Sequence, residues 1–371
     1  MNDKRSGSVE TEWIRNLENE ENKPALERAG QILQQGGLVA FPTETVYGLG
    51  GDAFNPESSR KIYEAKGRPS DNPLIVHICR ISDLEKVARD IPEVAYKLAD
   101  AYWPGPLTMI LSKQPSLPKE TTGGLETVAV RMPDHPVALA LIDAAGGFVA
   151  APSANTSGRP SPTLGKYVYE DLAGRVDMLL DAGQVGIGVE STIVDLTGDV
   201  PMILRPGYVT PEMLEEVLRK VELDPALAAG PLPDHGEKTL PPPKAPGMKY
   251  KHYAPKGEVT VLEGDNDKVS KRLLSELDEQ LLLGRKCGII VTEEMEHLLV
   301  ERGFDLAKIS VKHLGREGDL EAMAHGLFQF LREFDDEGVE KIYVKGVDEK
   351  GLGLAVMNRL KKAAGGKIIE V

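Results

Sequence analysis

Short apolar runs alternate with helical patterns in the first two thirds of the chain. Residues 24–37 have apolar side chains at helical spacing on one face, and Gly36 and Gly37 mark the end of that helix. Other runs are apolar on consecutive residues, which is typical of strands buried on both faces of a sheet. The predicted strands are 38–42, 73–78, 107–111, 127–133, 148–153, 178–183, 192–196 and 202–207, with covering helices such as 82–91 and 135–146.

The last third of the chain alternates more regularly. Strands are predicted at 258–264, 287–291, 307–311, 341–346 and 367–371, and helices at 268–284, 293–303, 321–338 and 352–365. This order predicts a parallel, Rossmann-like sheet. Residues 351–356 imitate a dinucleotide fingerprint, but Val356 stands where the third glycine would be, so a tight turn into a helix is the expectation. This domain is interpreted as structural or regulatory.

These patterns divide the chain into four parts and predict an α/β protein. The divisions are an N-terminal arm at 1–20, a twisted open α/β sheet domain at 21–222, a linker at 223–256 and a smaller Rossmann-like α/β domain at 257–371. The linker is rich in proline and glycine, and connections this long are uncommon unless they are functional or disordered. It could be a stiff spacer. It could also be a basic, aromatic strap that lies across an anionic ligand.

Composition narrows the class of protein. At 371 residues the chain is long enough for two domains with separate cores. Its two cysteines, Cys79 and Cys287, lack the spacing of a disulfide framework or a structural zinc site. A polar N-terminus and the absence of a long apolar run lead us to expect a cytoplasmic protein without a membrane span. The net charge of −14 argues against general affinity for nucleic acid, so any anion site must be local.

Candidate chemistry gathers where predicted strands end. There is no phosphate loop, HExxH, GxSxG or kinase-like motif. A rigid loop at 152–163 carries hydroxyl and amide groups that suit phosphate oxygens. Polar side chains also stand at the ends of other strands: Thr45, His77, Arg131, Ser191 and Arg205. Each alone has an ordinary structural explanation, but in an open α/β sheet such ends form the ligand crevice, so their convergence predicts an anionic ligand.

The motifs that carry these residues resemble a known family. Lys66 and Arg68 in KGR and Ser153 and Asn155 in SAN match the KxR and SxN signature of the YrdC-type threonylcarbamoyl-AMP synthases, in their two-domain form. The resemblance covers essentially the whole chain. Further matching segments are FPTETVYGLG, RPSDNPLIVH, WPGPLT, GVESTIVD and APGMKYKHYAP.

The resemblance implies a reaction. Such enzymes combine L-threonine, bicarbonate or CO2, and ATP to give threonylcarbamoyl-AMP and pyrophosphate. A separate transferase complex then moves the threonylcarbamoyl group to adenosine 37 of tRNAs that read ANN codons, so this step needs no tRNA contact. ATP is then a substrate, and Mg2+ is expected mainly through its phosphates, without a metal site made by the protein.

The resemblance also implies site residues. The signature residues Lys66, Arg68, Ser153 and Asn155 are the catalytic candidates. The expected threonine pocket is Thr45, His77, Arg131, Ala151 and Ser191. The expected ATP contacts are Arg68, Asn72, Thr127, Ser153, Ser161, Arg205 and Tyr253. Arg131 is predicted to clamp the threonine carboxylate, and Lys66, Arg68 and Arg205 to serve the phosphates. Tyr253 makes the linker a candidate lid.

Two alternatives stay open on the sequence. The first is a double-stranded RNA-binding or ribosome-maturation module, because YrdC-like domains have a basic concave surface, although the charge of −14 weighs against it. The second is another carbamoyl-adenylate enzyme, such as the hydrogenase-maturation carbamoyltransferases, whose additional domains and zinc-type cysteine spacings this chain lacks.

Overall fold

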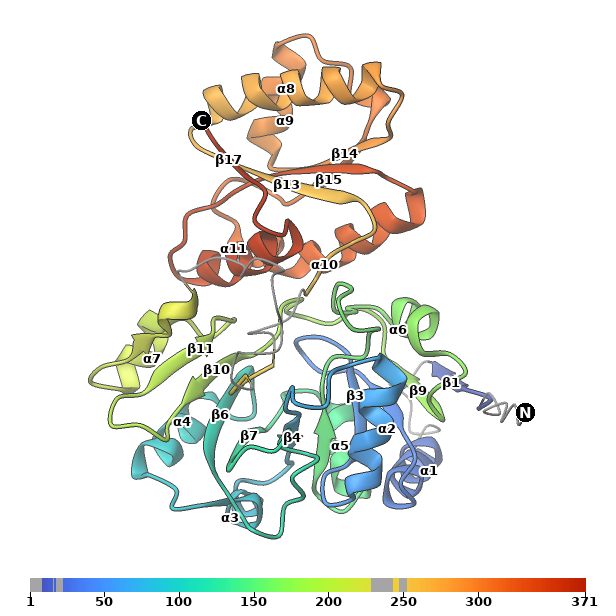
Figure 1. Ribbon diagram of the computed structural model, residues 1–371, viewed down its shortest axis with the longest axis vertical. Coiled ribbons are helices and arrows are strands. Elements are labelled where there is room, and N and C mark those ends of the chain that lie inside the picture. Colours follow the sequence, from blue (N-terminus) through green and yellow to red (C-terminus); the bar gives the residue numbers. More distant parts are fainter. Residues whose placement is uncertain (1–8, 16, 18–22, 228–242, 247–251) are drawn as a thin grey trace.

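The computed structural model describes residues 9–15, 17, 23–227, 243–246 and 252–371. Most of the predicted arm and two stretches of the predicted linker, 228–242 and 247–251, lie outside these residues. The described residues form two α/β units, one above the other in Figure 1. Among them, no helix is long and apolar enough to cross a membrane.

The first unit is built on one large sheet. Its strands are β1 Glu12–Arg15, β2 Val39–Phe41, β3 Gly48–Asp52, β4 Ile75–His77, β5 Ala88–Arg89, β6 Leu107–Lys113, β7 Thr127–Arg131, β8 Val149–Ala151, β9 Met178–Asp181, β10 Thr192–Asp195, β11 Met202–Arg205 and β12 Glu222–Leu223. Their order is β1-β9-β2-β3-β8-β4-β7-β6-β10-β11-β12, and β5 pairs with β6. Parallel and antiparallel pairs are mixed.

Helices pack on this sheet. They are α1 Lys23–Gln34, α2 Pro56–Lys66, α3 Leu84–Val87, α4 Glu93–Tyr102, α5 Pro136–Ala144, α6 Gly165–Leu172 and α7 Pro211–Val217, with single 3-10 turns at η2 Ile81–Asp83 and η3 Pro225–Leu227. The eight strands predicted in this unit are confirmed. The N-terminal arm differs from its prediction, because residues 12–15 pair with β9 as a parallel edge strand.

Strand β3 has the sequence GLGGD, which lacks the apolar pattern of the predicted strands. The structure makes these residues a buried strand between β2 and β8. A Cβ atom on Gly50 would lie 2.8 Å from Cγ1 of Val149. The glycine is therefore needed for close strand packing rather than for ligand approach.

The second unit is the predicted parallel sheet. Its strands are β13 Glu258–Glu263, β14 Cys287–Val291, β15 Ser310–His313, β16 Lys341–Lys345 and β17 Ile368–Glu370, in the order β15-β14-β16-β13-β17. Its helices are α8 Asn266–Leu282, α9 Glu293–Glu301, α10 Leu320–Glu337 and α11 Leu352–Ala363, with a 3-10 turn at η4 Leu306–Lys308. Every pair in this sheet is parallel, which confirms the prediction.

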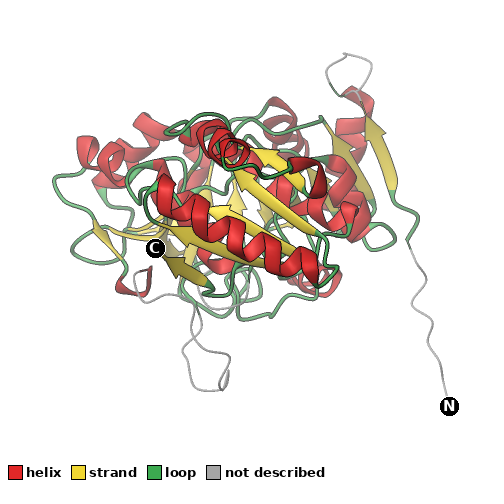
Figure 2. Cartoon of the chain, turned by 90° about the horizontal axis from the view of Figure 1, so that it is seen from above, coloured by secondary structure: helices red, strands yellow, loops and turns green. Residues whose placement is uncertain are grey.

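The helices of the second unit divide between its two faces. Figure 1 shows α8 and α9 on the face away from the first unit, while α10 and α11 lie between the second sheet and the first unit. Viewed from above, helices lie across the strands of this sheet (Figure 2). Because α10 and α11 line the contact between the units, their side chains are the ones that can reach the first domain.

The helix before KGR ends sharply. Asn55 caps α2 by accepting from the N–H of Glu57 at 3.0 Å, and Pro56 occupies the first turn. Gly67 stops the helix in the left-handed conformation, with φ of 62°. A side chain at this φ is strained even though no atom lies within 4 Å of the place a Cβ would take. This stop places Lys66 and Arg68 on either side of the turn.

The stop predicts a stability difference between two exposed glycines. Gly67→Ala should lower the free energy of unfolding by about 1 kcal/mol, because Ala must adopt the left-handed conformation. Gly198→Ala is the matched control: it lies in an exposed turn of the same unit without a positive φ, and a Cβ there meets only ordinary contacts. It should be neutral or slightly stabilising. Urea denaturation measures both, and equal effects would contradict this explanation.

Candidate active site

The site is laid out across one face of the large sheet. Strand register sets His77 opposite Arg131, Arg131 opposite Thr108, and Thr108 opposite Ile193. Arg205 continues the row beside Ile193. Residues directly opposite one another project from the same face of a sheet. The sequence predicted that only the carboxyl ends of strands would form the site, and this differs from the structure. Because β6 runs antiparallel to β7, the carboxyl end of β7 lies beside the amino end of β6.

The two faces of this sheet differ in character. Val76, Met109 and Val130 point to the helix-covered side and belong to the main apolar core. Ile75, Ala129 and Ile193 point the other way and form a smaller apolar floor. The remaining members of that floor are Ile110, Leu204 and Ala245. Ala245 belongs to the linker, so the linker covers this face.

A cavity of about 60 Å³ lies over the floor. Its walls include most of the predicted site residues: Thr45, Arg68, His77, Arg131, Ala151, Ser153, Asn155, Ser161, Ser191, Arg205 and Tyr253. Three predicted residues do not line it: Lys66, Asn72 and Thr127. The walls or their immediate neighbours also include five residues that the sequence motifs do not predict for the site: Thr43, Glu44, Thr108, Arg159 and Glu190.

Arg131 occupies one end of the cavity and is 4% exposed. Its Nη1 donates to Oγ1 of Thr45 at 2.9 Å, and its Nε donates to the carbonyl of Gly105 at 3.2 Å. Its Nη2 lies 2.6 Å from Oε1 of Glu44. The guanidinium is therefore held in a fixed plane, which is the geometry needed to bind a carboxylate with two parallel hydrogen bonds.

His77 is neutral in this setting. Burial, reinforced by the positive charge of Arg131, lowers the pKa of His77 to about 3. Its Nδ1 lies 3.1 Å from the carbonyl of Ile75, so Nδ1 carries the proton and donates to it. An uncharged imidazole beside Arg131 adds a polar group to the pocket without competing for an anion.

Arg205 and two hydroxyl groups form the opposite side. Its Nε donates to the carbonyl of Ser191 at 3.0 Å and its Nη2 to Oγ of Ser191 at 3.0 Å. The Ser191 hydroxyl also lies 2.8 Å from Oγ1 of Thr108. Burial lowers the pKa of Arg205 to about 10, so it still carries its charge at neutral pH.

Arg68 is held by the segment that follows it. Its Nη2 donates to Oδ1 of Asn72 at 2.6 Å and to the carbonyl of Pro73 at 3.0 Å, and its Nε donates to the carbonyl of Asn72 at 3.2 Å. Asn72 is 1% exposed. The structure therefore makes Asn72 a support for Arg68, whereas the resemblance implies an ATP contact.

Lys66 faces the SAN loop instead of the cavity. Its ammonium group is buried and donates to the carbonyls of Ser153 and Asn155 at 2.5 Å each. Burial, together with the charge of Arg68, lowers the pKa of Lys66 well below its ordinary value. The ammonium group also lies 3.4 Å from Oδ1 of Asn155, so all three contacts are with the loop; the expected phosphate contact of Lys66 stays a prediction. Lys66 fixes the loop that carries Ser153.

Thr127 lies at the far end of β7. It is paired with Ser112, four residues before Arg131, and it does not line the cavity. Along a strand this separation amounts to about 13 Å. The expected ATP contact of Thr127 stays a prediction, and it would require the nucleotide to extend beyond the cavity along β7.

The described parts of the linker close the cavity. We call residues 243–246 and 252–256 the strap. Ala245 is completely buried on the floor, and Lys244 lies 3.1 Å from Asp195. Tyr253 is 4% exposed and has a positive φ of 67°. Its ring packs on Phe328 of α10 with centroids 5.1 Å apart. The strap thus contacts both units while its tyrosine lines the cavity.

Two acidic groups lie among the site cations. Glu190 accepts from Oγ of Ser161 at 2.6 Å and from Nε of Arg359 at 3.0 Å. Burial opposes ionisation, yet Arg359 and Arg205 hold the pKa of Glu190 below its ordinary value. Glu44 and Glu190 stand beside predicted residues in PTET and GVEST, so their motifs contained the signal. The motifs did not mark these two residues for the site, because a carboxylate is not expected where an anion binds.

Comparisons with known proteins agree with this architecture. The family model Sua5/YciO/YrdC, described as "Telomere recombination", matches residues 31–207. The model described as "Threonylcarbamoyl-AMP synthase, C-terminal domain" matches residues 209–365. A threonylcarbamoyl-AMP synthase of Bacillus subtilis is 47% identical over 94% of this chain and 95% of its own length. The chain belongs to the Sua5/YrdC family of threonylcarbamoyl-AMP synthases.

A relative and a solved structure from a second organism also match nearly the whole chain. A threonylcarbamoyl-AMP synthase of Pyrococcus abyssi is 46% identical over 92% of this chain and 95% of its own. The crystal structure of P. abyssi Sua5 complexed with L-threonine is 44% identical, with a TM-score of 0.85 over 98% of this chain and 99% of that one. The predicted family, the two-domain α/β fold and the assignment as a nucleotidyltransferase are confirmed.

Proposed function

We propose that this member of the family joins L-threonine, bicarbonate or CO2, and ATP into threonylcarbamoyl-AMP, releasing pyrophosphate. The observation that carries the proposal is one cavity whose walls include three buried guanidinium groups, those of Arg68, Arg131 and Arg205. Such a cavity suits substrates that bring a carboxylate and a chain of phosphates.

L-Threonine would bind at the Arg131 end. Arg131 takes the carboxylate of the substrate, with Thr45 and the neutral His77 beside it. Ala151 and Ser191 complete this pocket. Because Glu44 lies against the same guanidinium, the incoming carboxylate competes with an existing ion pair. The pocket is therefore selective for a ligand that brings both a carboxylate and further hydrogen bonds.

ATP would bind toward Arg68 and Arg205. Both cations lie against the phosphates, and the hydroxyl groups of Ser153 and Ser161 donate to phosphate oxygens. Lys66 and Asn155 act indirectly, because they hold the loop that carries Ser153. Tyr253 lies over the nucleotide.

The chemical step is a displacement at phosphorus. A carbamate oxygen forms the new bond to the α-phosphorus, the bond from that phosphorus to the bridging oxygen breaks, and pyrophosphate leaves with the electron pair. Catalysis consists mainly of positioning and of stabilising negative charge. No side chain is assigned as a general base, because carbamate forms from the free amine of threonine before this step.

Mg2+ would enter with the nucleotide. Among the described residues there is no group of three His, Cys, Asp or Glu side chains that could hold a metal ion. The two carboxylates at the cavity are both committed to arginines. Mg2+ would therefore be bound mainly through phosphate oxygens, where it neutralises charge.

The strap would serve as a lid. Ala245 of the strap lies on the floor and Tyr253 lines the cavity, so movement of the strap would change the access of a nucleotide to the floor. Closure of the strap over bound substrates, in a position that leaves room for them, would keep water from the labile carbamate and mixed anhydride. The product would then pass to a separate transferase in the cytoplasm that acts on tRNA, and this step itself would need no tRNA.

Release of pyrophosphate tests the proposed function. Purified full-length protein with ATP and Mg2+ should release pyrophosphate only when both L-threonine and bicarbonate are present. A coupled phosphate assay measures the rate, and omission of each substrate is the control. Release that ignores threonine would contradict the proposal.

Two substitutions test the assignment of the cavity. Arg68→Ala and Ser153→Ala should each lower the rate at least about tenfold, the scale of a lost charge-assisted contact. Arg60→Ala is the matched control, because Arg60 is an exposed arginine of α2 whose partners Glu57 and Glu120 lie outside the cavity. It should stay within about twofold of the wild-type rate. Near-normal rates in both cavity variants would contradict the assignment of the KxR and SxN signature residues to the active site.

A further inference from the structure

Two arginines of the C-terminal unit are completely buried against the first unit. Arg332 of α10 and Arg359 of α11 are both 0% exposed, and they are the largest fully buried side chains among the described residues. Burying a guanidinium is costly unless each charge is paired and hydrogen-bonded. Their partners must therefore be well placed, and those partners lie in the first unit.

Arg332 binds the base of the SAN loop. Its Nη1 and Nη2 donate to the two carboxylate oxygens of Asp171, at 3.0 and 2.6 Å. Its Nε and Nη2 also donate to the carbonyl of Pro160, at 3.0 and 2.8 Å. Arg332 and Asp171 therefore form a bidentate salt bridge in which both side chains are fully buried.

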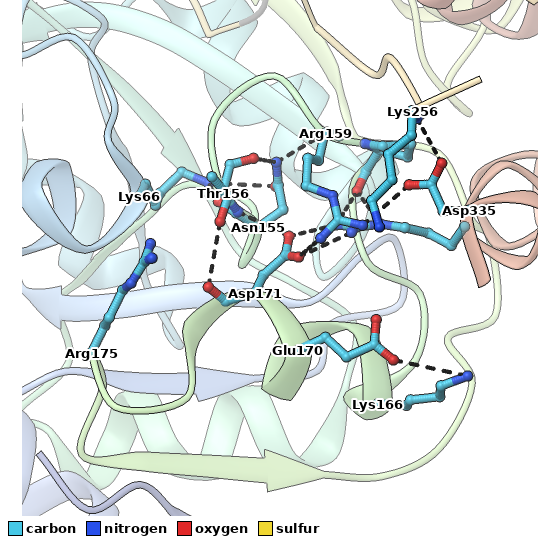
Figure 3. Close-up of polar contacts among 12 residues, drawn as sticks. Lys66, Asn155, Thr156, Arg159, Lys166, Glu170, Asp171, Arg175, Lys256 and Asp335 are labelled. Carbon is cyan, nitrogen blue, oxygen red and sulfur yellow. Dashed lines mark hydrogen bonds and ion pairs between the residues drawn. The ribbon is translucent and has the colours of Figure 1, made fainter. Parts of the chain in front are cut away.

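Asp171 passes this constraint to the loop. Its Oδ2 accepts from the backbone N–H of Thr156 at 3.0 Å, and its Oδ1 accepts from Arg159, a residue of the cavity wall. Figure 3 shows Asp171 between Thr156 and Arg159, with Asp335 of α10 on the far side of Arg159. Arg159 also lies 3.1 Å from Asp335. The C-terminal unit therefore holds the loop on one side, and Lys66 holds it on the other.

Arg359 binds a second wall of the cavity. Its Nε donates to Oε2 of Glu190, and its Nη1 donates to the carbonyl of Pro206. Glu190 in turn accepts from Ser161 and directly precedes Ser191, the partner of Arg205. Pro206 directly follows Arg205. Arg359 therefore fixes the segments that carry Ser161 and Arg205.

Some polar contacts between the units lie away from the cavity. Lys166 of α6 lies 2.7 Å from Asp336 of α10, with both side chains at least a third exposed. Gln184 donates to Gln329 at 2.7 Å in an exposed position. If the buried arginines only held the units together, exposed partners would serve. Both instead bind segments that line the ATP side of the cavity.

We propose that the C-terminal domain is part of the ATP site, because Arg332 and Arg359 position the Ser153–Ser161 loop and the Glu190 and Arg205 segments. They are positioning residues, since they act through Asp171, Pro160, Glu190 and Pro206. At the threonine end, Arg131 is held by Thr45, Glu44 and Gly105, and the described partners of Arg332 and Arg359 do not include these residues. The inference rests on the proposed function and predicts a selective loss of ATP binding.

Conservative variants of the full-length protein test this inference. Arg332→Lys and Arg359→Lys keep the positive charge and most of the stem but lose the planar fork. Titration calorimetry with ATP and Mg2+ should show a dissociation constant raised at least tenfold in each variant. The dissociation constant for L-threonine alone should stay within twofold. Lys166→Met is the matched control at the same interface, and it should change neither constant by more than twofold.

A purely structural role would give a different result. If the arginines only stabilise the interface, the folded variants will bind ATP normally, or will lose ATP and threonine binding together, and either result overturns the inference. Arg332→Met and Arg359→Met, which remove the charge, should weaken ATP binding further, and Lys should rescue part of that loss. Wild-type protein that binds no ATP overturns the proposed function itself, whereas ATP binding unchanged in the Lys variants overturns only this inference.

Discussion

The compensation of buried positive charge is the constraint on which this structure depends. Cations with at most 8% exposure surround the cavity and its supports: Lys66, Arg68, Arg131, Arg205, Arg332 and Arg359. Each would be unstable in a dry interior without fixed oxygen partners. Backbone carbonyls serve Lys66, and carboxylates serve Arg332 and Arg359. An acidic protein can thus keep a local site for anions.

This compensation also explains the acidic and neutral groups of the site. Glu44 and Glu190 stand beside Arg131 and Arg359 because a guanidinium without a counter-charge would be too costly to bury. His77 stays neutral because it lies beside Arg131 in a buried position. When a substrate brings its own negative charge, it joins a network whose geometry is already fixed. Such preorganisation lowers the cost of ordering the site around a highly charged reaction.

Much of the fold could be predicted from local sequence pattern. Apolar runs and helix caps are local signals, so the strands from 38 to 207 and the parallel second sheet were recognised. The mixed order of the first sheet could not be recognised in this way, because pairing direction depends on contacts between distant segments. Strand β3 was missed because its glycines carry no hydrophobic pattern, and their role appears only beside Val149.

Much of the site could also be predicted from the sequence. The motifs identified most of the residues that line the cavity, since each motif ends at the same face of the sheet. They did not show that Lys66 points at the carbonyls of Ser153 and Asn155, because side-chain direction is set by tertiary packing. The contacts of Arg332 and Arg359 could not be predicted for the same reason. Their partners lie more than 150 residues away in the first unit, and the two arginines stand on helices of a domain that the sequence alone marks as structural or regulatory.

The fate of labelled bicarbonate tests the central claim most directly. Full-length protein supplied with ATP, L-threonine and 13C-bicarbonate should form a product whose mass equals threonine plus 13CO2 plus AMP minus one water, detected by rapid mass spectrometry. Phosphorus NMR should show one pyrophosphate for each product molecule. A threonine adduct of AMP without the label, or AMP and pyrophosphate without any adduct, would contradict the account.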